Sequence, residues 1–183
     1  VPRGDEIVPL VNSLAPRFSL VIASQDWHPA DHLSFASQHT GHRAGDVIDL
    51  DGEQQILWPD HCVQHSAGAS FASGLDVYRI DEVVRKGDDR SVDSYSAFFD
   101  NDHKRATGLE KLLRSRGVDR LFICGLATDY CVKFTALDAA KLGFDTTVIG
   151  DAIRAVNLHE GDEERALEEM RSAGASIIES AQL

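Results

Sequence analysis

Short runs of apolar, β-branched residues alternate along the chain with stretches in which apolar positions recur every three to four residues. Residues 19–24 (SLVIAS), 120–125 (RLFICG) and 146–150 (TTVIG) have the pattern of buried strands, and a last strand is expected near 176–178. Such alternation requires crossover connections between strands. The pattern therefore predicts an α/β fold with a mainly parallel, doubly wound sheet and helices on both faces.

Four segments have the apolar spacing of helices, and all but the first end at a glycine, which is a frequent helix terminator. These segments are residues 5–15, 108–117, 128–143 and 162–174. With 183 residues, 43% of them hydrophobic, the chain can bury one sizeable core. A single domain over residues 1–183 is the resulting prediction.

The regular pattern breaks down between Trp27 and Lys86, where histidine, aspartate, glycine and serine are frequent. Irregular segments of this length are uncommon in compact domains and are usually functional or disordered. Because this one contains aromatic residues such as Phe35 and Trp58, we expect it to be ordered and to form a site. We therefore predict a metal-site loop region over about residues 26–86.

The formal net charge is −12, from thirty acidic and eighteen basic residues. This charge repels phosphate groups, so nucleic acid and anionic membrane surfaces are not expected as partners. The sequence contains no apolar run long enough to span a membrane and no pattern typical of a secretory signal, so we expect a soluble, cytoplasmic protein. The three cysteines form no CxxC pair, which argues against a disulfide framework.

The densest chemical motif is DWHPADH, directly after the apolar run SLVIAS. In open α/β sheets ligands bind beyond the carboxyl ends of strands, where Asp26, His28 and His32 would emerge. His61 is a plausible fourth ligand from the long loop region. Carboxylate and imidazole ligands suit Zn, Fe or Mn and do not distinguish among them. The alternative is a chance cluster, since the chain has eight histidines.

Cys131 lies in the first turn of the helix predicted after the strand RLFICG. Unpaired N–H groups and the helix dipole favour a thiolate there and could stabilise an oxyanion, although most free cysteines are small buried hydrophobic residues. Cys124, within the strand, is expected in the core. Cys62, which directly follows His61, could be a ligand or pack against its neighbours, and packing is favoured.

Lys86 follows a short apolar run, so it would project from the end of a strand. Considered alone it would be a solvated surface lysine. Beside a cysteine, however, its charge would lower the pKa of the thiol.

Together these motifs resemble the nicotinamidases of the isochorismatase-like cysteine hydrolases. The resemblance runs from GDEIVPLVN through SQDWHPADHLSFASQH, WPDHCVQ, KGDDRSVDSYSAFFDN and GLATDYCVKFTALDA to DAIRAVN, and so covers nearly the entire chain. Isochorismatases and carbamoyl-cleaving relatives share the lysine and cysteine regions but lack the Asp-x-His-x-x-x-His motif. The resemblance therefore points to the nicotinamidase branch.

The resemblance implies hydrolysis of nicotinamide to nicotinic acid and ammonia through a cysteine thioester, with one divalent ion (Zn, Fe or Mn) as cofactor. Its implied ligands are Asp26, His28, His32 and His61. Its implied catalytic residues are Cys131 and Lys86, with the N–H groups of Ala127 and Cys131 as oxyanion hole after a cis Leu126–Ala127 bond. Trp58 and Tyr95 would line the pyridine pocket, although Tyr95 could equally pack in the core. Because relatives range from monomers to larger assemblies, a homo-oligomer stays open.

One part of the family pattern is absent from this sequence. Family members have a catalytic aspartate at the end of the first strand, followed by an aromatic residue, and neither is found here. Asp5 and Glu6 align with a later segment. We expect that the first strand is missing from this chain and that the parent protein is longer by roughly one strand and loop. The alternatives are a cysteine hydrolase of another small amide, or a non-catalytic metal-binding fragment.

Overall fold

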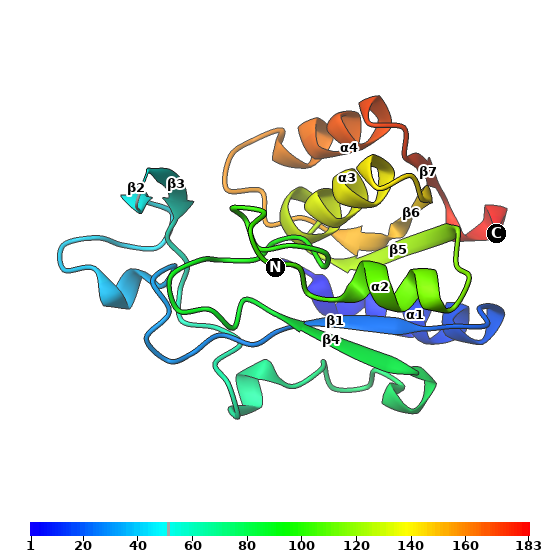
Figure 1. Ribbon diagram of the computed structural model, residues 1–183, viewed down its shortest axis with the longest axis horizontal. Helices are drawn as coiled ribbons and strands as arrows, with labels where there is room; N and C mark the ends of the chain where they lie inside the picture. Colours follow the sequence, from blue (N-terminus) through cyan, green and yellow to red (C-terminus); the bar gives the residue numbers. More distant parts are fainter. Residues whose placement is uncertain (51) are drawn as a thin grey trace.

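The computed structural model describes residues 1–50 and 52–183, whose strands form two parallel sheets and one antiparallel hairpin (Figure 1). Strand β1 (Ile22–Asp26) pairs with β4 (Glu82–Lys86) in parallel. The second parallel sheet has the order β5 (Arg120–Leu126), β6 (Asp145–Arg154) and β7 (Ser176–Ile178). The hairpin consists of β2 (Val47–Leu50) and β3 (Glu53–Ile56) and projects from one end of the molecule.

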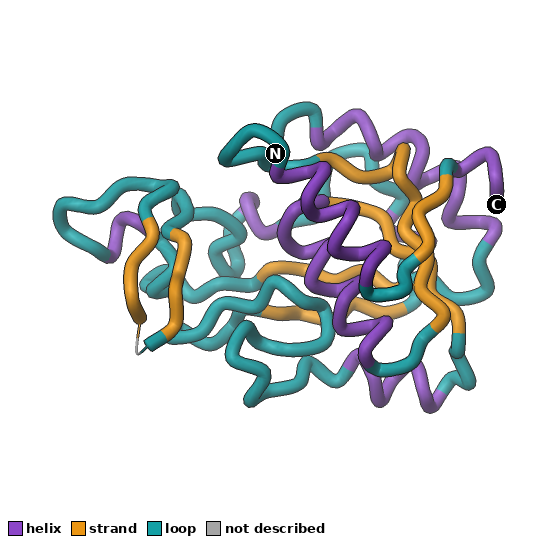
Figure 2. The backbone as a smooth tube through the Cα atoms, turned by 90° about the horizontal axis from the view of Figure 1, so that it is seen from above, coloured by secondary structure: helices purple, strands orange, loops and turns teal. Residues whose placement is uncertain are grey.

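The helices cover both faces of the second sheet, as the alternation of elements predicted (Figure 2). They are α1 (Val8–Leu14), α2 (Leu109–Ser115), α3 (Lys133–Lys141) and α4 (Asp162–Ser172). Neighbouring residues of β6 point to opposite faces: Val148 packs with Ala136 of α3 and Met170 of α4, whereas Ile149 packs with Leu14 of α1. In the described part of the chain, no helix is long and apolar enough to cross a membrane.

The predicted α/β fold is confirmed, with differences at some boundaries. The first strand begins at Ile22 instead of residue 19, and β6 extends four residues past the predicted end. The loop region contains the hairpin β2–β3, which the sequence reading missed. The dipeptide Asp51-Gly52, flanked by alternating residues, is the signal that could have revealed it.

Strands β1 and β5 belong to different sheets, and a cavity of about 710 Å³ lies between them. Residues of both strands line it, Ile22 and Ser24 on one side and Ile123 and Cys124 on the other. Cys124 was expected in the core, and this is wrong: its side chain is surrounded by protein on most sides but is exposed to the cavity.

Candidate active site and metal centre

Parallel pairing brings the first two chemical motifs together at one edge of a sheet. In the register of β1 and β4, Asp26 and Lys86 are direct partners, and each is the last residue of its strand. Carboxyl ends of parallel strands point the same way, so residues sixty positions apart become neighbours. Lys86 is only 3% exposed, which excludes the role of a solvated surface lysine.

The ammonium group of Lys86 connects the carboxylate of Asp26 with the thiol of Cys131. Its Nζ donates hydrogen bonds to the Ser94 carbonyl oxygen (2.5 Å) and to Cys131 Sγ (3.4 Å). It also forms an ion pair with Asp26, in which Nζ lies 2.6 Å from Oδ1. One buried cation therefore touches both the predicted nucleophile and a predicted metal ligand.

Charge pairing keeps both partners of this ion pair ionised. Burial alone would lower the pKa of Lys86, but the charge of Asp26 and then that of Cys131 raise it well above its ordinary value. Burial opposes ionisation of Asp26 too, yet the attraction of Lys86 holds the pKa of this carboxyl below its usual range. A fixed positive charge is thus available beside the thiol near neutral pH.

Asp26, His28 and His61 form a group whose potential ligand atoms all lie within 4.8 Å of one another. The Nδ1 of His28 lies 2.7 Å from the Gly87 carbonyl oxygen, and that of His61 lies 2.9 Å from the Pro59 carbonyl oxygen. Since a carbonyl only accepts, both rings carry their proton on Nδ1 and leave the Nε2 lone pair free. This is the usual arrangement of metal-binding histidines.

His32 does not join this group. Its ligand atom lies within 4.8 Å of those of His28 and Asp93, in a second, fully buried cluster. The backbone N–H of Ser34 donates to His32 Nδ1 (3.1 Å), so the neutral ring carries its proton on Nε2. Burial lowers the pKa of His32 and favours this neutral form. The Nε2 atom of His32 is buried and has no hydrogen-bond partner among the described residues, and the predicted role of His32 as a fourth ligand stays a prediction.

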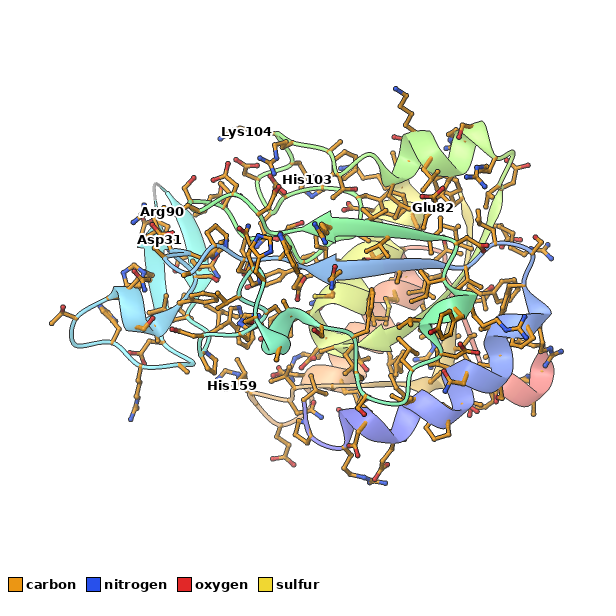
Figure 3. The ribbon with its side chains drawn as sticks, turned by 90° about the horizontal axis from the view of Figure 1, so that it is seen from below. Asp31, Glu82, Arg90, His103, Lys104 and His159 are labelled. Atoms are coloured by element: carbon orange, nitrogen blue, oxygen red, sulfur yellow. The ribbon has the colours of Figure 1, made fainter. Side chains whose placement is uncertain are left out.

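Asp93 is a residue that the sequence reading missed. Its carboxylate is 4% exposed and accepts a hydrogen bond from the Ser94 N–H (2.7 Å). Nothing in its local pattern singles it out, because its importance comes from the approach of the segment after β4 to His28 and His32. A link between Arg90 and Asp31, 2.6 Å from Nε to Oδ2, ties that segment to the histidine loop (Figure 3).

Two further contacts fix the histidine rings. Phe35 is fully buried, and its ring centroid lies 5.6 Å from those of His28, His32 and His61. Gly87 has φ +64°, and a Cβ at this position would come within 2.5 Å of the His28 ring. The glycine after Lys86 is therefore required both by backbone conformation and by the close approach of the imidazole.

The donor set fits a divalent metal ion. Local hydrogen bonds engage Nδ1 of His28 and of His61 and leave Nε2 free, and both rings lie in one group of potential ligand atoms with the Asp26 carboxylate, which Lys86 holds ionised. Two imidazole nitrogens and one carboxylate oxygen are common ligands of Zn, Fe and Mn.

Cys131 lies where β5 turns into α3. The Leu126–Ala127 peptide bond is cis, as the family resemblance implied, and it leads into a π-helical turn, Thr128–Val132, that contains the cysteine. The backbone N–H of Ala127 has no partner among the described residues, so it is free to bind an oxyanion. Burial raises the pKa of Cys131 to about 11, although Lys86 opposes this rise. The thiol is therefore mainly protonated at neutral pH, contrary to the expectation from the helix start.

The aromatic side chains predicted to line the substrate pocket stand edge to face with one another. The ring centroids of Trp58 and Tyr95 are 6.4 Å apart, and Trp58 Nε1 donates to the Tyr95 hydroxyl oxygen (3.1 Å). Tyr130, which the sequence reading did not single out, lies 4.7 Å from Trp58 and 5.4 Å from Tyr95. Its position directly before Cys131 was the available signal. The structure thus brings both predicted wall residues together and adds a third ring.

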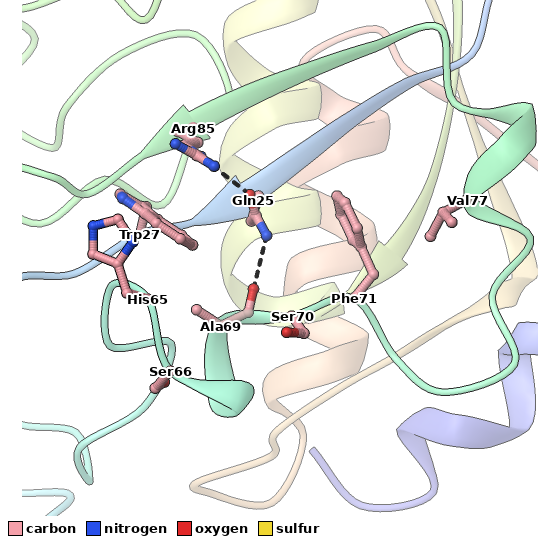
Figure 4. A pocket seen from close by; sticks show the side chains of 9 residues that line it. All are labelled: Gln25, Trp27, His65, Ser66, Ala69, Ser70, Phe71, Val77 and Arg85. Atoms are coloured by element: carbon pink, nitrogen blue, oxygen red, sulfur yellow. Dashed lines mark hydrogen bonds between the residues drawn. The ribbon is translucent and has the colours of Figure 1, made fainter.

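A second cavity, of about 440 Å³, lies on the other side of β1 and β4 (Figure 4). Trp27, Phe71 and Arg85 contribute to its wall, and none of the predicted site residues lines it. Both ends of the Gln25 amide there are already hydrogen-bonded, to Ala69 and Arg85. This cavity is therefore separate from the site. Cys62, beside His61, is half-buried and joins neither metal-ligand group.

Comparisons with known proteins agree with this geometry. The isochorismatase domain model matches residues 4–182. The chain is 50% identical to the nicotinamidase of Escherichia coli over 181 residues, which cover 97% of this chain and 84% of that protein.

Solved structures give the same result. The chain is similar to a nicotinamidase pyrazinamidase of Acinetobacter baumanii (TM-score 0.96, 43% identity, 100% of this chain and 87% of that one). It is also similar to a pyrazinamidase of Pyrococcus horikoshii in complex with zinc (TM-score 0.77, 38% identity, 98% of this chain and 88% of that one). The family-model match spans nearly the whole chain, and the chain therefore belongs to the isochorismatase family.

Proposed function

We propose that this protein hydrolyses nicotinamide to nicotinic acid and ammonia, with Cys131 as the nucleophile. The observation that carries the proposal is the continuous contact from Asp26 through Lys86 to Cys131, because it joins the metal-ligand group to a thiol. The E. coli relative is a nicotinamidase, and its similarity extends over almost the whole chain. The aromatic rings of Trp58, Tyr95 and Tyr130 suit a flat heteroaromatic substrate.

We assign the metal ion to Asp26, His28 and His61. The zinc in the pyrazinamidase structure of Pyrococcus horikoshii supports zinc for this chain as well, with Fe and Mn compatible with the same donors. When bound, the ion would orient the ring nitrogen of the substrate and would not activate the nucleophile. His28, His32 and Asp93 form a second group of potential ligand atoms, so His32 stays a candidate for a fourth ligand.

In the proposed reaction Cys131 loses its thiol proton and its sulfur attacks the carboxamide carbon. The C–S bond forms as the carbonyl electrons move to oxygen, where the N–H groups of Ala127 and Cys131 stabilise the negative charge. The C–N bond then breaks, the nitrogen takes up the proton that the thiol released, and ammonia departs, so that a thioester remains on Cys131. Water hydrolyses the thioester to the acid and restores the thiol. The ammonium of Lys86, held by Asp26 and the Ser94 carbonyl, stabilises the thiolate.

No carboxylate among the described residues hydrogen-bonds to Cys131 Sγ, whose described partner is Lys86 Nζ, so we assign no described residue as the base that takes the thiol proton. Asp5 and Glu6 are exposed, and Glu6 pairs with Arg3 and Arg154. Neither acidic residue is a candidate for the base. Whether the protein is a homo-oligomer stays a prediction.

Ammonia release from nicotinamide by the chain and by two matched variants tests the proposal. Cys131→Ala should lose activity by about a thousandfold or more, because the covalent step cannot occur. Cys124→Ala makes the same cysteine-to-alanine change on β5, the strand that leads into the Cys131 turn, and should retain activity. Both variants should keep their metal. Ammonia release by Cys131→Ala at the rate of the unchanged chain would contradict the assignment, as would a preference for carbamoylated amines over nicotinamide.

A further inference from the structure

The hydroxyl oxygen of Tyr95 receives two N–H donors from different parts of the chain. Trp58 Nε1 donates to it over 3.1 Å and Gln55 Nε2 over 3.4 Å. A phenol oxygen has two lone pairs, so both are in use and the proton must point away from these donors. Burial, together with the charge of Asp93, raises the pKa of Tyr95 far above its ordinary value, so the group stays a neutral phenol.

Gln55 is oriented by a second contact. Its Nε2 also donates to the Ile56 carbonyl oxygen (2.6 Å), and because a carbonyl only accepts, the amide must present its NH₂ group on this side. The side chain is 7% exposed, although it belongs to a hairpin that projects from the body of the protein (Figure 1). A buried amide with a fixed orientation restricts where the Tyr95 hydroxyl can lie.

The bond to Tyr95 is also the one side-chain hydrogen bond that the described residues of β2 and β3 make outside their hairpin. It joins β3 to the segment after Lys86, forty residues away. Trp58 follows β3 by two residues and shares the same acceptor. The hairpin, the indole and the phenol are therefore one hydrogen-bonded unit beside the cysteine-bearing turn.

We propose that Gln55 is a positioning residue that holds the Tyr95 hydroxyl, and through it the edge-to-face pair of the Tyr95 and Trp58 rings, in place beside the cysteine-bearing turn, which makes the hairpin β2–β3 a determinant of substrate binding. This inference rests on the proposed function for the identity of the substrate. The hydrogen-bonded unit of hairpin, indole and phenol is independent of it. In the described structure Gln55 makes no hydrogen bond to Cys131 or Lys86, so it acts on binding through the two rings and leaves the reacting groups in place.

The test replaces Gln55 by leucine, which is similar in size but has no N–H donor. The neighbouring Gln54→Leu is a matched control, because Gln54 lies on the same strand, is exposed and makes no side-chain hydrogen bond in the described structure. Gln55→Leu should raise KM for nicotinamide roughly threefold to tenfold, the effect of losing one neutral hydrogen bond, with kcat nearly unchanged. Gln54→Leu should change neither constant.

A second readout needs no catalysis. The chain has two tryptophans, Trp27 and Trp58, so Trp27→Phe leaves Trp58 as the only indole fluorophore. In that background Gln55→Leu should increase acrylamide quenching of Trp58 by about twofold, because the unit loosens locally, while Gln54→Leu should leave quenching as it was.

Three results would overturn the inference: equal KM values for the two leucine variants, equal quenching of Trp58 in both, or a loss confined to kcat. If the unchanged chain releases no ammonia but Gln55→Leu alone increases quenching, the positioning role stands and the proposed function fails. If nicotinamide is hydrolysed and the two leucine variants behave alike, the proposed function stands and the positioning role fails.

Discussion

The cysteine side and the metal side of the site lie at the ends of parallel strands but are assembled from different kinds of contact. The cysteine side is one continuous stretch, in which β5, the turn Thr128–Val132 and α3 follow one another. Backbone hydrogen bonds fix the turn: the N–H groups of Tyr130 and Val132 both donate to the Ala127 carbonyl oxygen. Val132 and Ala136 anchor it in the core.

The metal side combines three segments that are distant in sequence, around His28, His61 and Gly87. Its rings are oriented by single side-chain-to-backbone hydrogen bonds and by Phe35. Lys86 is where the two sides meet. The difference shows that the proposed nucleophile depends on local structure, whereas the proposed ion site depends on the close approach of loops. Small changes in the loops should therefore affect metal binding first.

The largest predicted effect is a loss of metal affinity in the variant Gly87→Ala. The new methyl group would collide with the His28 ring, and φ +64° is unfavourable for any residue with a Cβ. We expect the affinity for Zn²⁺ to fall by about a hundredfold, which displacement of one ligand from a first-row metal site readily causes. Metal content after dialysis and a competitive Zn²⁺ titration measure this.

Gly117→Ala is the matched control. Gly117 has nearly the same backbone angle, φ +67°, but no atom lies within 4 Å of a Cβ built on it. This variant should lose about 1 kcal/mol of stability from the backbone strain and keep its metal affinity. If the two alanine variants bound Zn²⁺ equally well, the close approach of Gly87 to His28 would not matter for the site.

A smaller effect should separate two influences on the pKa of Cys131: burial of the thiol, which raises it, and the charge of Lys86, which lowers it. Because the pKa of Cys131 is raised to about 11, its thiolate fraction, and so its alkylation by iodoacetamide, should rise about tenfold per pH unit from pH 7 to about 10. Lys86→Met removes a cation that lowers this pKa, so alkylation of Cys131 should slow at every pH in that range.

Cys124 is the internal control for this experiment, since burial alone raises its pKa to about 11. Peptide-resolved mass spectrometry should find its alkylation rate unchanged by Lys86→Met. A plateau in Cys131 alkylation near neutral pH would show instead that the thiolate already prevails there, as the helix start had suggested.

The same contrast explains how much could be predicted from the sequence. The alternation of strands and helices predicted the parallel fold, and the strand, turn and helix around Cys131 are adjacent in the chain. Asp26, His28 and His61 were found because their motifs are dense in ligand types, and the structure brings them together.

What the sequence did not reveal depends on contacts between distant segments. The placement of His32 beside Asp93 follows from the fold of the segment after β4, and no local pattern encodes it. Exposure of Cys124 follows from the cavity between β1 and β5, whereas its own strand reads as buried. The pKa of Cys131 depends on how closely the protein surrounds the thiol, which the helix-start pattern does not report.

Mass spectrometry of the protein quenched with acid during turnover of saturating nicotinamide tests directly whether Cys131 is the nucleophile. We expect a nicotinoyl group, bound as a thioester, on the peptide that contains Cys131, and its disappearance once the substrate is exhausted. Nicotinoyl on Cys62 or Cys124, or rapid turnover with the Cys131 peptide unmodified throughout, would contradict it.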